Sequence, residues 1–364
     1  MESSAVPFIY LQSDYGAPMM IKSVQVNKLF NEFDYIVNMA GALTFLHSPN
    51  GYGKTTLMHM IFSALRGDVK YLQEVPFERM VIAFDDESFL IVDKSGGEMR
   101  LLVQKFEVDY PLTPEEMAEV AKATYIPPER LVIKKRDGHL ASALETYAQE
   151  LYEHVRYAKE HRELVEQPSE GREEMTDGEL EFWAKDLKAK LDFIKDAGFE
   201  PDLPPRYRFP PSRYDLSTNR EGYEGLIHSI AEYVDRNYPL AESIIVFKDI
   251  VNDIFINKTL TISDAGKIGI YMQNGTALQL QKLSSGEKQI LIMFYILLFH
   301  TEPESIVILD EPEISLHVSW QQKLGSVFQD ICRTRGIQMI VATHSPQVIH
   351  DKWDLARELR VNNA

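Results

Sequence analysis

The chain has 364 residues, of which 45% are hydrophobic and 26% are charged. This composition is typical of a globular protein with one large domain or two smaller ones. The formal net charge of -17 argues against a protein whose whole surface binds nucleic acid, because phosphate binding relies on a positive field.

Two further features limit where the protein works. Its longest apolar run, Ile290–Phe299, is far shorter than the roughly 20 residues of a membrane-spanning helix, and the first thirty residues lack a signal-peptide pattern. The single cysteine, Cys332, excludes an internal disulfide and a cysteine-based zinc site. We therefore expect a soluble, cytoplasmic protein with no membrane partner.

The first third of the chain predicts short strands around one helix. Alternating or apolar runs bounded by turn residues predict strands over Ile21–Val26, Tyr35–Val37, Leu43–Leu46, Met80–Phe84, Phe89–Val92 and Arg100–Val103. The helix is predicted over Lys54–Leu65. This part resembles a β-rich subdomain joined to a nucleotide-binding core.

The middle of the chain changes to polar helices. Thr113 and Glu116 form a capping box with proline between them, which predicts a helix to about Ala123. Two longer helices are predicted over Ala141–His161 and Thr176–Ala197, separated by the breaker-rich segment 167–174, and we interpret them as a helical hairpin. The proline-rich segment 200–211 is then the return linker.

After Gly222 the pattern predicts alternating helices and strands, with strongly apolar strands over Ser305–Leu309 and Gln338–Ala342. The fold class predicted from this order is α/β, an ATPase head of P-loop type with a β-rich subdomain and a helical insertion. The predicted domains are 1–110 and 216–364, the two halves of the head, and 111–215, the insertion.

A phosphate-binding loop is predicted at residues 48–56, which read SPNGYGKTT between a strand and a helix. Gly51 and Gly53 allow the backbone N–H groups to converge on an anion at the helix N-terminus. Lys54 reaches the β- and γ-phosphates of ATP, and Thr55 offers its hydroxyl to Mg²⁺. The predicted nucleotide-binding residues are Asn50, Gly51, Gly53, Lys54, Thr55 and Thr56. Ser48 stands where this motif ordinarily has its first glycine, and it would be strained if the loop required a positive φ there.

Two acids and a histidine follow the two apolar strands of the C-terminal part. Carboxylates at the end of a buried parallel strand are costly unless they serve a cation or a water molecule. We assign Asp310 to the Mg²⁺ shell with Thr55, and Glu311 as the general base that polarises the attacking water. His344 is suited to contact the γ-phosphate and orient that water.

A second anion site is predicted at residues 283–289, which read LSSGEKQ before an apolar helix. Ser285 and Gly286 are the residues assigned to it. A rotated dimer in which each copy closes these residues over the γ-phosphate bound to the other copy would bring the two half-sites together.

Together, SPNGYGKTT, LSSGEKQ, ILDEPEISLH and ATHSP resemble, in this order, the motifs of the ATP-binding-cassette superfamily. The residues of these motifs resemble those of its soluble SMC-, RecF- and OLD-like ATPases more than those of its transporter subunits. The resemblance covers residues 21–105 and 222–350 and implies ATP, Mg²⁺ and a homodimer closed around ATP. It also implies that Ile314–His317 contacts the other copy. A Q-loop glutamine (Gln73 or Gln104) and an adenine-stacking aromatic (Phe33 or Tyr35) stay unassigned.

The resemblance leads to a hypothesis and an alternative. The first is a dimeric switch ATPase of bacterial anti-phage defence that regulates or scaffolds a separate effector such as a nuclease or toxin, because the chain has no other catalytic constellation and stops about twenty residues after His344. The alternative is a RecF- or SMC-like DNA repair ATPase. Its motivation is two basic segments, one at Lys134, Lys135 and Arg136 and the other at Arg206, Arg208 and Arg213; we favour a solvated surface for both.

Overall fold

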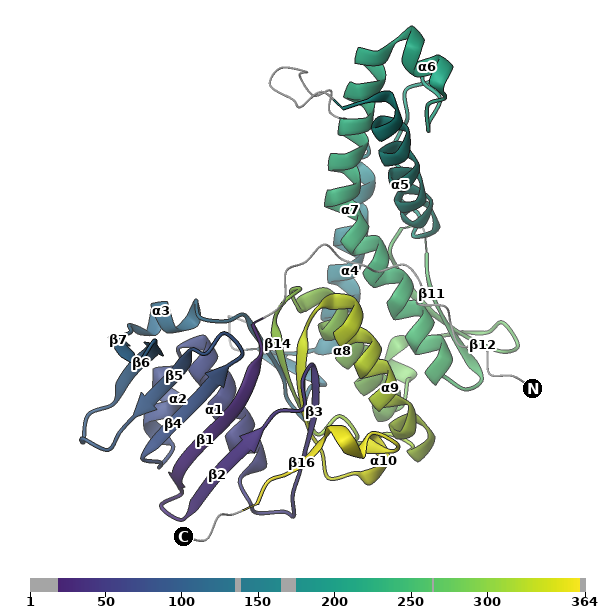
Figure 1. Cartoon of the computed structure of the whole chain (residues 1–364). Helices are drawn as coiled ribbons and strands as arrows, with labels where there is room; N and C mark the ends of the chain where they lie inside the picture. The colour runs from purple at the N-terminus through teal and green to yellow at the C-terminus, as the bar shows by residue number, and fades with distance from the viewer. Residues whose placement is uncertain (1–18, 135–138, 165–174, 264, 361–364) are drawn as a thin grey trace. The chain divides into compact units, whose positions relative to one another are not determined.

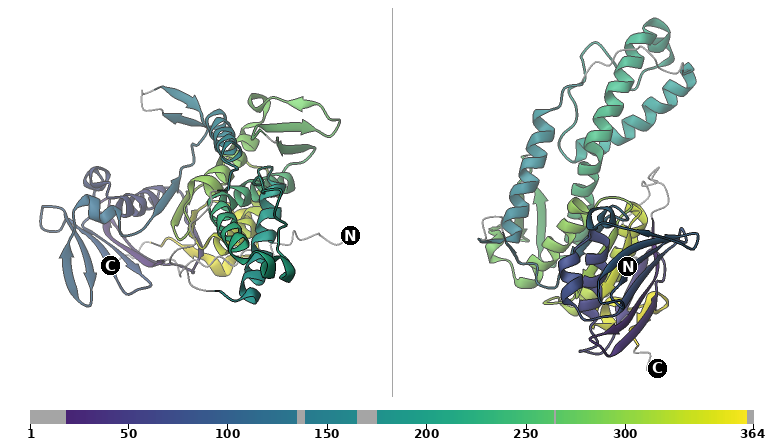
Figure 2. Two further views of the ribbon diagram at one scale, coloured as in Figure 1. Left: turned by 90° about the horizontal axis from the view of Figure 1, so that it is seen from above. Right: turned by 90° about the vertical axis from the view of Figure 1, so that its left-hand side faces the viewer.

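The computed structural model describes residues 19–134, 139–164, 175–263 and 265–360. The chain divides into two compact units, one formed by Met1–Arg130 with His300–Ala364 and the other by Leu131–Phe299. Figures 1 and 2 show the elements of each unit.

The first unit contains a parallel and an antiparallel sheet. The five strands of the parallel sheet follow the order β16-β3-β15-β14-β8. They are β3 (Leu43–His47), β8 (Ala123–Ile126), β14 (Ile306–Asp310), β15 (Gln338–Ala342) and β16 (Ala356–Glu358). The antiparallel sheet follows the order β2-β1-β4-β5-β6-β7. Its strands are β1 (Ile21–Leu29), β2 (Phe33–Asn38), β4 (Arg79–Phe84), β5 (Phe89–Asp93), β6 (Arg100–Lys105) and β7 (Val108–Pro111).

The core of this unit forms around α1 (Lys54–Arg66), whose apolar residues pack with side chains from both sheets. Every residue of β14 and β15 is buried, as expected for parallel strands covered on both faces. The remaining helices of the unit are α2 (Val69–Glu74), α3 (Pro114–Ala118), α9 (Val318–Arg335), α10 (Pro346–Ile349) and the 3₁₀ turn η3 (Trp353–Leu355).

The buried side chain of Gln338 joins the two sheets. At the start of β15, its Oε1 accepts from the N–H of Ile21 at 2.7 Å, and its Nε2 donates to the carbonyl oxygens of Ile21 at 2.8 Å and Gly41 at 3.1 Å. A buried amide is stable only when its donors and acceptor are paired. Gln338 therefore fixes β1 against the parallel sheet at one place.

The second unit is mainly helical. Its helices are α4 (Ala143–Glu160), α5 (Asp177–Asp196), α6 (Arg213–Thr218), α7 (Arg220–Ile254), the 3₁₀ turn η1 (Leu280–Lys282), α8 (Ser285–Tyr295) and the π-helical turn η2 (Ile296–His300). Its short strands are β9 (Val132–Lys134), β10 (Leu140–Ser142), β11 (Lys258–Ile262), β12 (Ile268–Met272) and β13 (Ala277–Leu278). In the views of Figures 1 and 2, α5 lies along α7.

The predicted α/β class and the predicted strands of the first third are confirmed. The helix predicted to run to Ala123 is too long, because α3 ends at Ala118 and Ala123–Ile126 is strand β8 of the parallel sheet. The predicted hairpin of the two long helices is also wrong: α5 packs against α7, while α4 packs against α8.

The compact units also differ from the predicted domain boundaries. Strand β8 lies in the first unit, although we placed it in the insertion, and α8 lies in the second, although we placed it in the head. The alternating helices and strands predicted after Gly222 are present, but they begin with one long helix, α7, which runs for 35 residues from Arg220 to Ile254. The breaker-rich segment 167–174 lies outside the described residues.

Throughout the ranges that the structure describes, none of the helices has both the length and the apolar character needed to cross a membrane.

The turn after α1 gives the first testable prediction. Gly67 ends α1 with a φ of +66°, and a Cβ on it would lie 2.0 Å from the carbonyl oxygen of Pro114. We expect Gly67→Ala to lower the free energy of unfolding by at least about 2 kcal/mol, from the left-handed backbone and the backbone clash together. Urea unfolding measures this.

Gly96→Ala is the matched control, because a Cβ there meets nothing within 4 Å. Equal effects of the two substitutions would contradict the packing described for Gly67.

Candidate functional site

The predicted phosphate-binding loop joins β3 to α1. Gly51 and Gly53 have φ angles of +87° and +71°, a left-handed conformation that glycine adopts without strain. A Cβ on Gly53 would lie 3.0 Å from the ring of Phe30, so this position also lacks room for a side chain. The loop and His344 line one cavity of about 330 Å³, bounded by Pro49, Asn50, Gly51, Tyr52, Gly53, Lys54, Thr55, Thr56 and His344. The structure therefore brings the predicted loop residues and the predicted histidine together.

Ser48 is tolerated at the first position of the loop. It is buried, its hydroxyl donates to the carbonyl oxygen of Pro49 at 3.2 Å, and it is not among the described residues with a positive φ. The strain that a serine would suffer in a left-handed turn does not arise.

The ammonium group of Lys54, from the loop after β3, contacts residues that follow β14 and β15. Its Nζ lies 3.2 Å from Glu311 Oε1, 2.7 Å from His344 Nε2 and 3.2 Å from the carbonyl oxygen of Thr343. His344 Nε2 in turn lies 3.1 Å from Glu311 Oε1. Lys54 of the loop, the predicted base Glu311 and His344, the histidine predicted to orient the attacking water and called the switch histidine below, thus form one contacting cluster.

Burial shifts the acid–base properties of this cluster. It raises the pKa of Glu311 to about 7, with the neighbouring carboxylate of Glu313 adding to the rise. It lowers the pKa of Lys54 and of His344, and for the histidine the positive charge of Lys54 lowers the pKa further. Glu311 therefore has a proton affinity suited to accepting a proton near neutral pH.

Asp310 ends β14 and is fully buried. Its Oδ2 accepts from the hydroxyl of Tyr125 on β8 at 3.2 Å, and the side chain of Thr55 also hydrogen-bonds to it. Burial raises the pKa of Asp310. Its Oδ1 is buried with no hydrogen-bond partner among the described residues. A hydroxyl beside an unsatisfied carboxylate oxygen, next to a phosphate-binding loop, fits Mg²⁺, which prefers oxygen ligands and phosphate.

Glu313 is an acid of the site that was not predicted from the sequence. Its Oε1 accepts from Thr343 Oγ1 at 2.6 Å, from the N–H of His344 at 2.8 Å and from the N–H of Ser345 at 3.0 Å. The acidic repeat of Glu311 and Glu313 around Pro312 was the available signal, but only the fold shows that the second acid reaches the loop after β15.

Arg130 was also missed, because β8 was not predicted. This side chain is 4% exposed and follows β8, with Nη1 donating to the carbonyl oxygen of Pro127 and Nη2 to that of Pro312, both at 3.1 Å. It fixes the end of β8 to the segment that follows β14.

The predicted second anion site lies in the second unit, at the N-terminus of α8. Ser284 caps α8 in a capping box with Glu287, whose carboxylate also pairs with Lys258 of β11. Ser285 is exposed and Gly286 is buried within the first turn of α8. The local geometry is that of a helix N-terminus held by a buried carboxylate.

Of the unassigned aromatic candidates, Tyr35 is excluded as a stacking surface. It is 1% exposed and its hydroxyl donates to the carbonyl oxygen of Tyr52 at 2.7 Å. Phe33 stacks on Tyr52 of the loop, with centroids 6.2 Å apart and planes at 20°. Gln104 lies in β6 bonded to Asp109, and Gln73 lies in α2.

The segment Ile314–His317 leads from the acids into α9. Ser315 has a φ of +64°, Ile314 is exposed, and His317 caps α9. An exposed segment is compatible with the predicted contact to a second copy.

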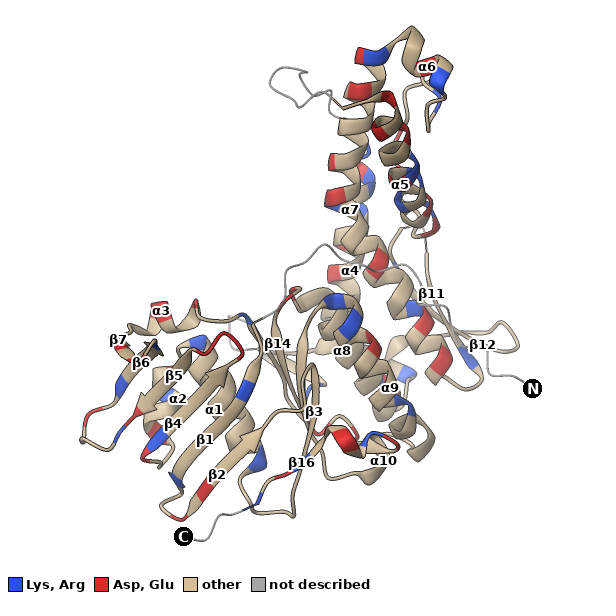
Figure 3. Cartoon of the chain, in the orientation of Figure 1, with Lys and Arg blue, Asp and Glu red and all other residues tan. Residues whose placement is uncertain are grey.

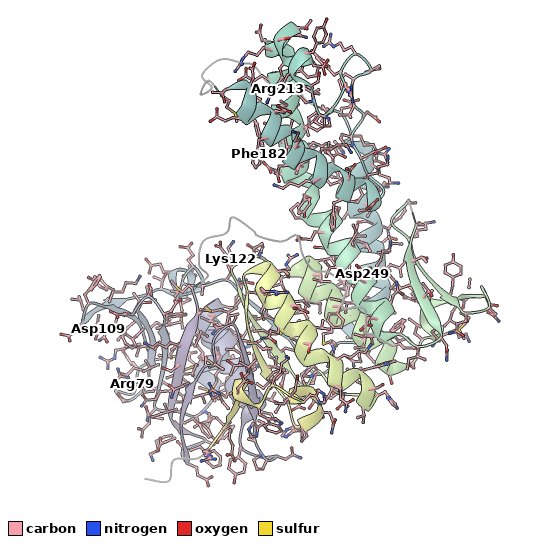
Figure 4. The ribbon with its side chains drawn as sticks, turned by 45° about the vertical axis from the view of Figure 1, so that its right-hand side comes forward. Arg79, Asp109, Lys122, Phe182, Arg213 and Asp249 are labelled. Carbon is pink, nitrogen blue, oxygen red and sulfur yellow. The ribbon has the colours of Figure 1, made fainter. Side chains whose placement is uncertain are left out.

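The basic segment on the second unit is largely compensated by acids. Arg213, at the α6 position marked in Figure 4, pairs with Glu181 at 3.3 Å, and the charge of Arg208 acts on nearby Asp215. Figure 3 shows acidic and basic residues interspersed along α5 and α7. Lys135, Arg136 and the side chain of Lys134, which make up the other basic segment, lie outside the described residues.

A protein-family model described as "AAA domain, putative AbiEii toxin, Type IV TA system" matches residues 145–350, more than half of the chain. The match includes Ser285, Asp310, Glu311 and His344 but begins after the phosphate-binding loop.

The chain is also similar to a "Retron Ec83 probable ATPase" of Escherichia coli, with 38% identity over 89 residues. The match spans 21% of this chain and only 16% of that relative.

Among solved structures, the chain is similar to an Smc head domain bound to the C-terminal domain of ScpA from Pyrococcus furiosus (TM-score 0.45, 13% identity, 91% of each chain). It is also similar to the SMC head domain from Thermotoga maritima (TM-score 0.43, 12% identity, 91% of each chain).

The buried acid cluster gives a prediction about pH. The folded-state pKa of Glu311 is raised from 4.5 to about 7, so the folded protein binds more protons than the unfolded chain between these values, and stability falls as pH rises through this range. We expect the free energy of unfolding of the wild type, relative to Glu311→Gln, to fall by about 3 kcal/mol from pH 4.5 to 8 and then level off.

Denaturant unfolding with EDTA and without nucleotide measures this difference. A difference between the two proteins that stays flat over the range would contradict the raised pKa.

Proposed function

The chain belongs to the AAA-domain family of the putative AbiEii toxin type, and we propose that it is a switch ATPase that binds and hydrolyses ATP as a homodimer. The observation that carries this proposal is the convergence of Lys54, Glu311 and His344 beside a loop of phosphate-binding geometry. Burying an ammonium group costs free energy unless an opposite charge is paired with it. A buried lysine at this position is therefore better explained by anion binding than by packing alone.

The residues of the first unit have complementary roles in the proposed reaction. The loop N–H groups of Gly51–Thr56 and the start of α1 hold the phosphates, and Lys54 neutralises them. The phosphates compete with Glu311 and His344 for Lys54, so ATP binding frees Glu311 to accept a proton from the attacking water. His344 then lies where it orients that water against the γ-phosphate.

Thr55 and Asp310 are the residues that would hold Mg²⁺, which when bound neutralises charge on the phosphate oxygens. The unsatisfied Oδ1 of Asp310 supports this assignment. The hydroxyl of Tyr125 holds the other oxygen and orients the carboxylate.

We propose a dimer because the predicted anion site at Ser285 and Gly286, at the capped N-terminus of α8, is a second half-site separate from the phosphate-binding loop. In a two-fold dimer, each copy supplies its loop to one ATP and its α8 N-terminus to the other. Hydrolysis removes the shared γ-phosphate and loosens the dimer, which makes the protein a switch.

We further propose that this switch controls a separate effector protein in bacterial defence against phage. The support is the family, whose description names a toxin of a toxin–antitoxin system, and the retron relative. Purification from the native host with and without ATP, followed by mass spectrometry, tests it. A nucleotide-dependent protein partner is expected, whereas recovery of nucleic acid alone would favour the DNA-repair alternative. No observation on the described basic residues favours that alternative, because Arg213 is already paired.

Two substitutions separate ATP binding from hydrolysis. Lys54→Ala removes the charge that meets the phosphates, and we expect it to abolish binding of a fluorescent ATP analogue. Glu311→Gln keeps the shape but not the base, so we expect intact binding, at least 100-fold slower phosphate release and a dimer that persists with ATP in size-exclusion chromatography. Normal hydrolysis by Glu311→Gln would show that the base is assigned wrongly.

Mixing two inactive proteins tests the shared site. Lys54→Ala destroys the loop half-site, and Ser285→Arg destroys the α8 half-site. A heterodimer of the two retains one intact composite site, so an equimolar mixture with random pairing regains about a quarter of wild-type activity. A mixture as inactive as its components, although mass spectrometry detects the heterodimer, would rule out a site shared between copies.

A further inference from the structure

The switch histidine is held in place by a carboxylate from another strand end. Glu313 follows β14 by three residues, and His344 follows β15 by two. One oxygen of Glu313 accepts three hydrogen bonds from Thr343, His344 and Ser345, at 2.6 to 3.0 Å. All three donors belong to one turn of the chain, so the carboxylate fixes the backbone of that turn and not a single side chain.

The bonds leave the imidazole of His344 free of Glu313 itself. The histidine contributes its backbone N–H to Glu313, while its Nε2 faces Lys54 and Glu311. The arrangement thus sets where the ring points without using the ring's own hydrogen-bonding atoms.

Both ends of this link are anchored. On the acid side, Arg130 bonds to the carbonyl oxygen of Pro312 at 3.1 Å. On the histidine side, Ser345 Oγ donates to Gln321 Oε1 on α9 at 2.6 Å. Because the residues at both ends of this hydrogen-bonded link are held in place, a displacement of Glu313 also displaces the turn that carries His344.

We infer that Glu313 is a positioning residue for His344, which ties the histidine to the segment leading into Ile314–His317. This inference rests on the proposed ATPase function, in which His344 orients the attacking water. It extends that function, because Ile314–His317 is the segment predicted to contact the second copy. A displacement of Ile314–His317 therefore moves His344 through the carboxylate of Glu313.

The test compares ATP hydrolysis and ATP binding in the full chain. Glu313→Ala is expected to lower kcat about 100-fold, the usual effect of misplacing a group by about 1 Å, and to change the affinity for a fluorescent ATP analogue by less than about threefold. Glu313→Gln keeps one acceptor oxygen and is expected to recover part of the loss. Thr343→Val removes one of the three donors and should cost less than Glu313→Ala.

A double-mutant cycle distinguishes positioning from general stabilisation. In a His344→Ala background, Glu313→Ala should cost at least about tenfold less than in the wild type, because no imidazole is left to position and only the effect of Glu313 on the pKa of Glu311 remains. A loss in that background as large as in the wild type, or an unchanged kcat in Glu313→Ala, would overturn the inference. If Glu313→Ala fails to fold, the same cycle with Glu313→Gln decides the question.

Glu302→Ala is the matched control. Glu302 is a surface acid of the same unit paired with Lys122, and its loss should leave kcat unchanged. If the wild type hydrolyses no ATP, the proposed function fails. If the wild type is active and only the cycle fails, the inference about Glu313 fails alone.

Discussion

The buried ammonium group of Lys54 is the charge on which the arrangement of the first unit depends. It is 5% exposed and has three acidic neighbours, Glu311 in contact and Glu313 and Asp310 close by. Removing one member of a buried ion pair leaves an uncompensated charge, which is more costly than the pair itself. The positions of the loop, the acids and the histidine are therefore interdependent.

In the proposed ATPase, the same interaction couples the nucleotide to the cluster. Under this proposal, a nucleotide bound to Lys54 replaces Glu311 and His344 as its partners, and both side chains are then available for other contacts. The proposed ligand thereby acts directly on the residues that follow β14 and β15. Differential contacts of this kind are what a ligand needs to shift a conformational equilibrium.

The residues of this cluster could be predicted because each is marked by its neighbours in the sequence. The loop is recognised from its own glycines and the helix that follows. The two acids lie at the end of β14 and the histidine follows β15, and both strands are apolar and buried along their whole length. Glu313 and Arg130 were missed for the opposite reason, since each makes a contact with a residue 30 or more positions away in the sequence. The short strand β8 was lost because its four residues follow a helix-capping signal, and only pairing with β14 makes them a strand. The packing of α5 on α7 was missed as well, because a polar helix gives no signal about which of two neighbours it covers.

The order of strands turns these separate segments into one site. In the sequence the loop after β3 and the acids after β14 are more than 250 residues apart, yet in the sheet only β15 lies between β3 and β14. Because the three strands are parallel, their carboxyl ends meet at one edge, where open α/β sheets bind ligands. β15, in the middle, delivers His344 between the lysine and the acids, and β8 on the far side of β14 delivers Tyr125 to Asp310. A family model that begins at residue 145 includes β14 and β15 but neither β3 nor β8. The site is therefore complete only with the segments that come before the matched region, and the parallel pairing of β3 with β15 is what adds the phosphate-binding loop to it.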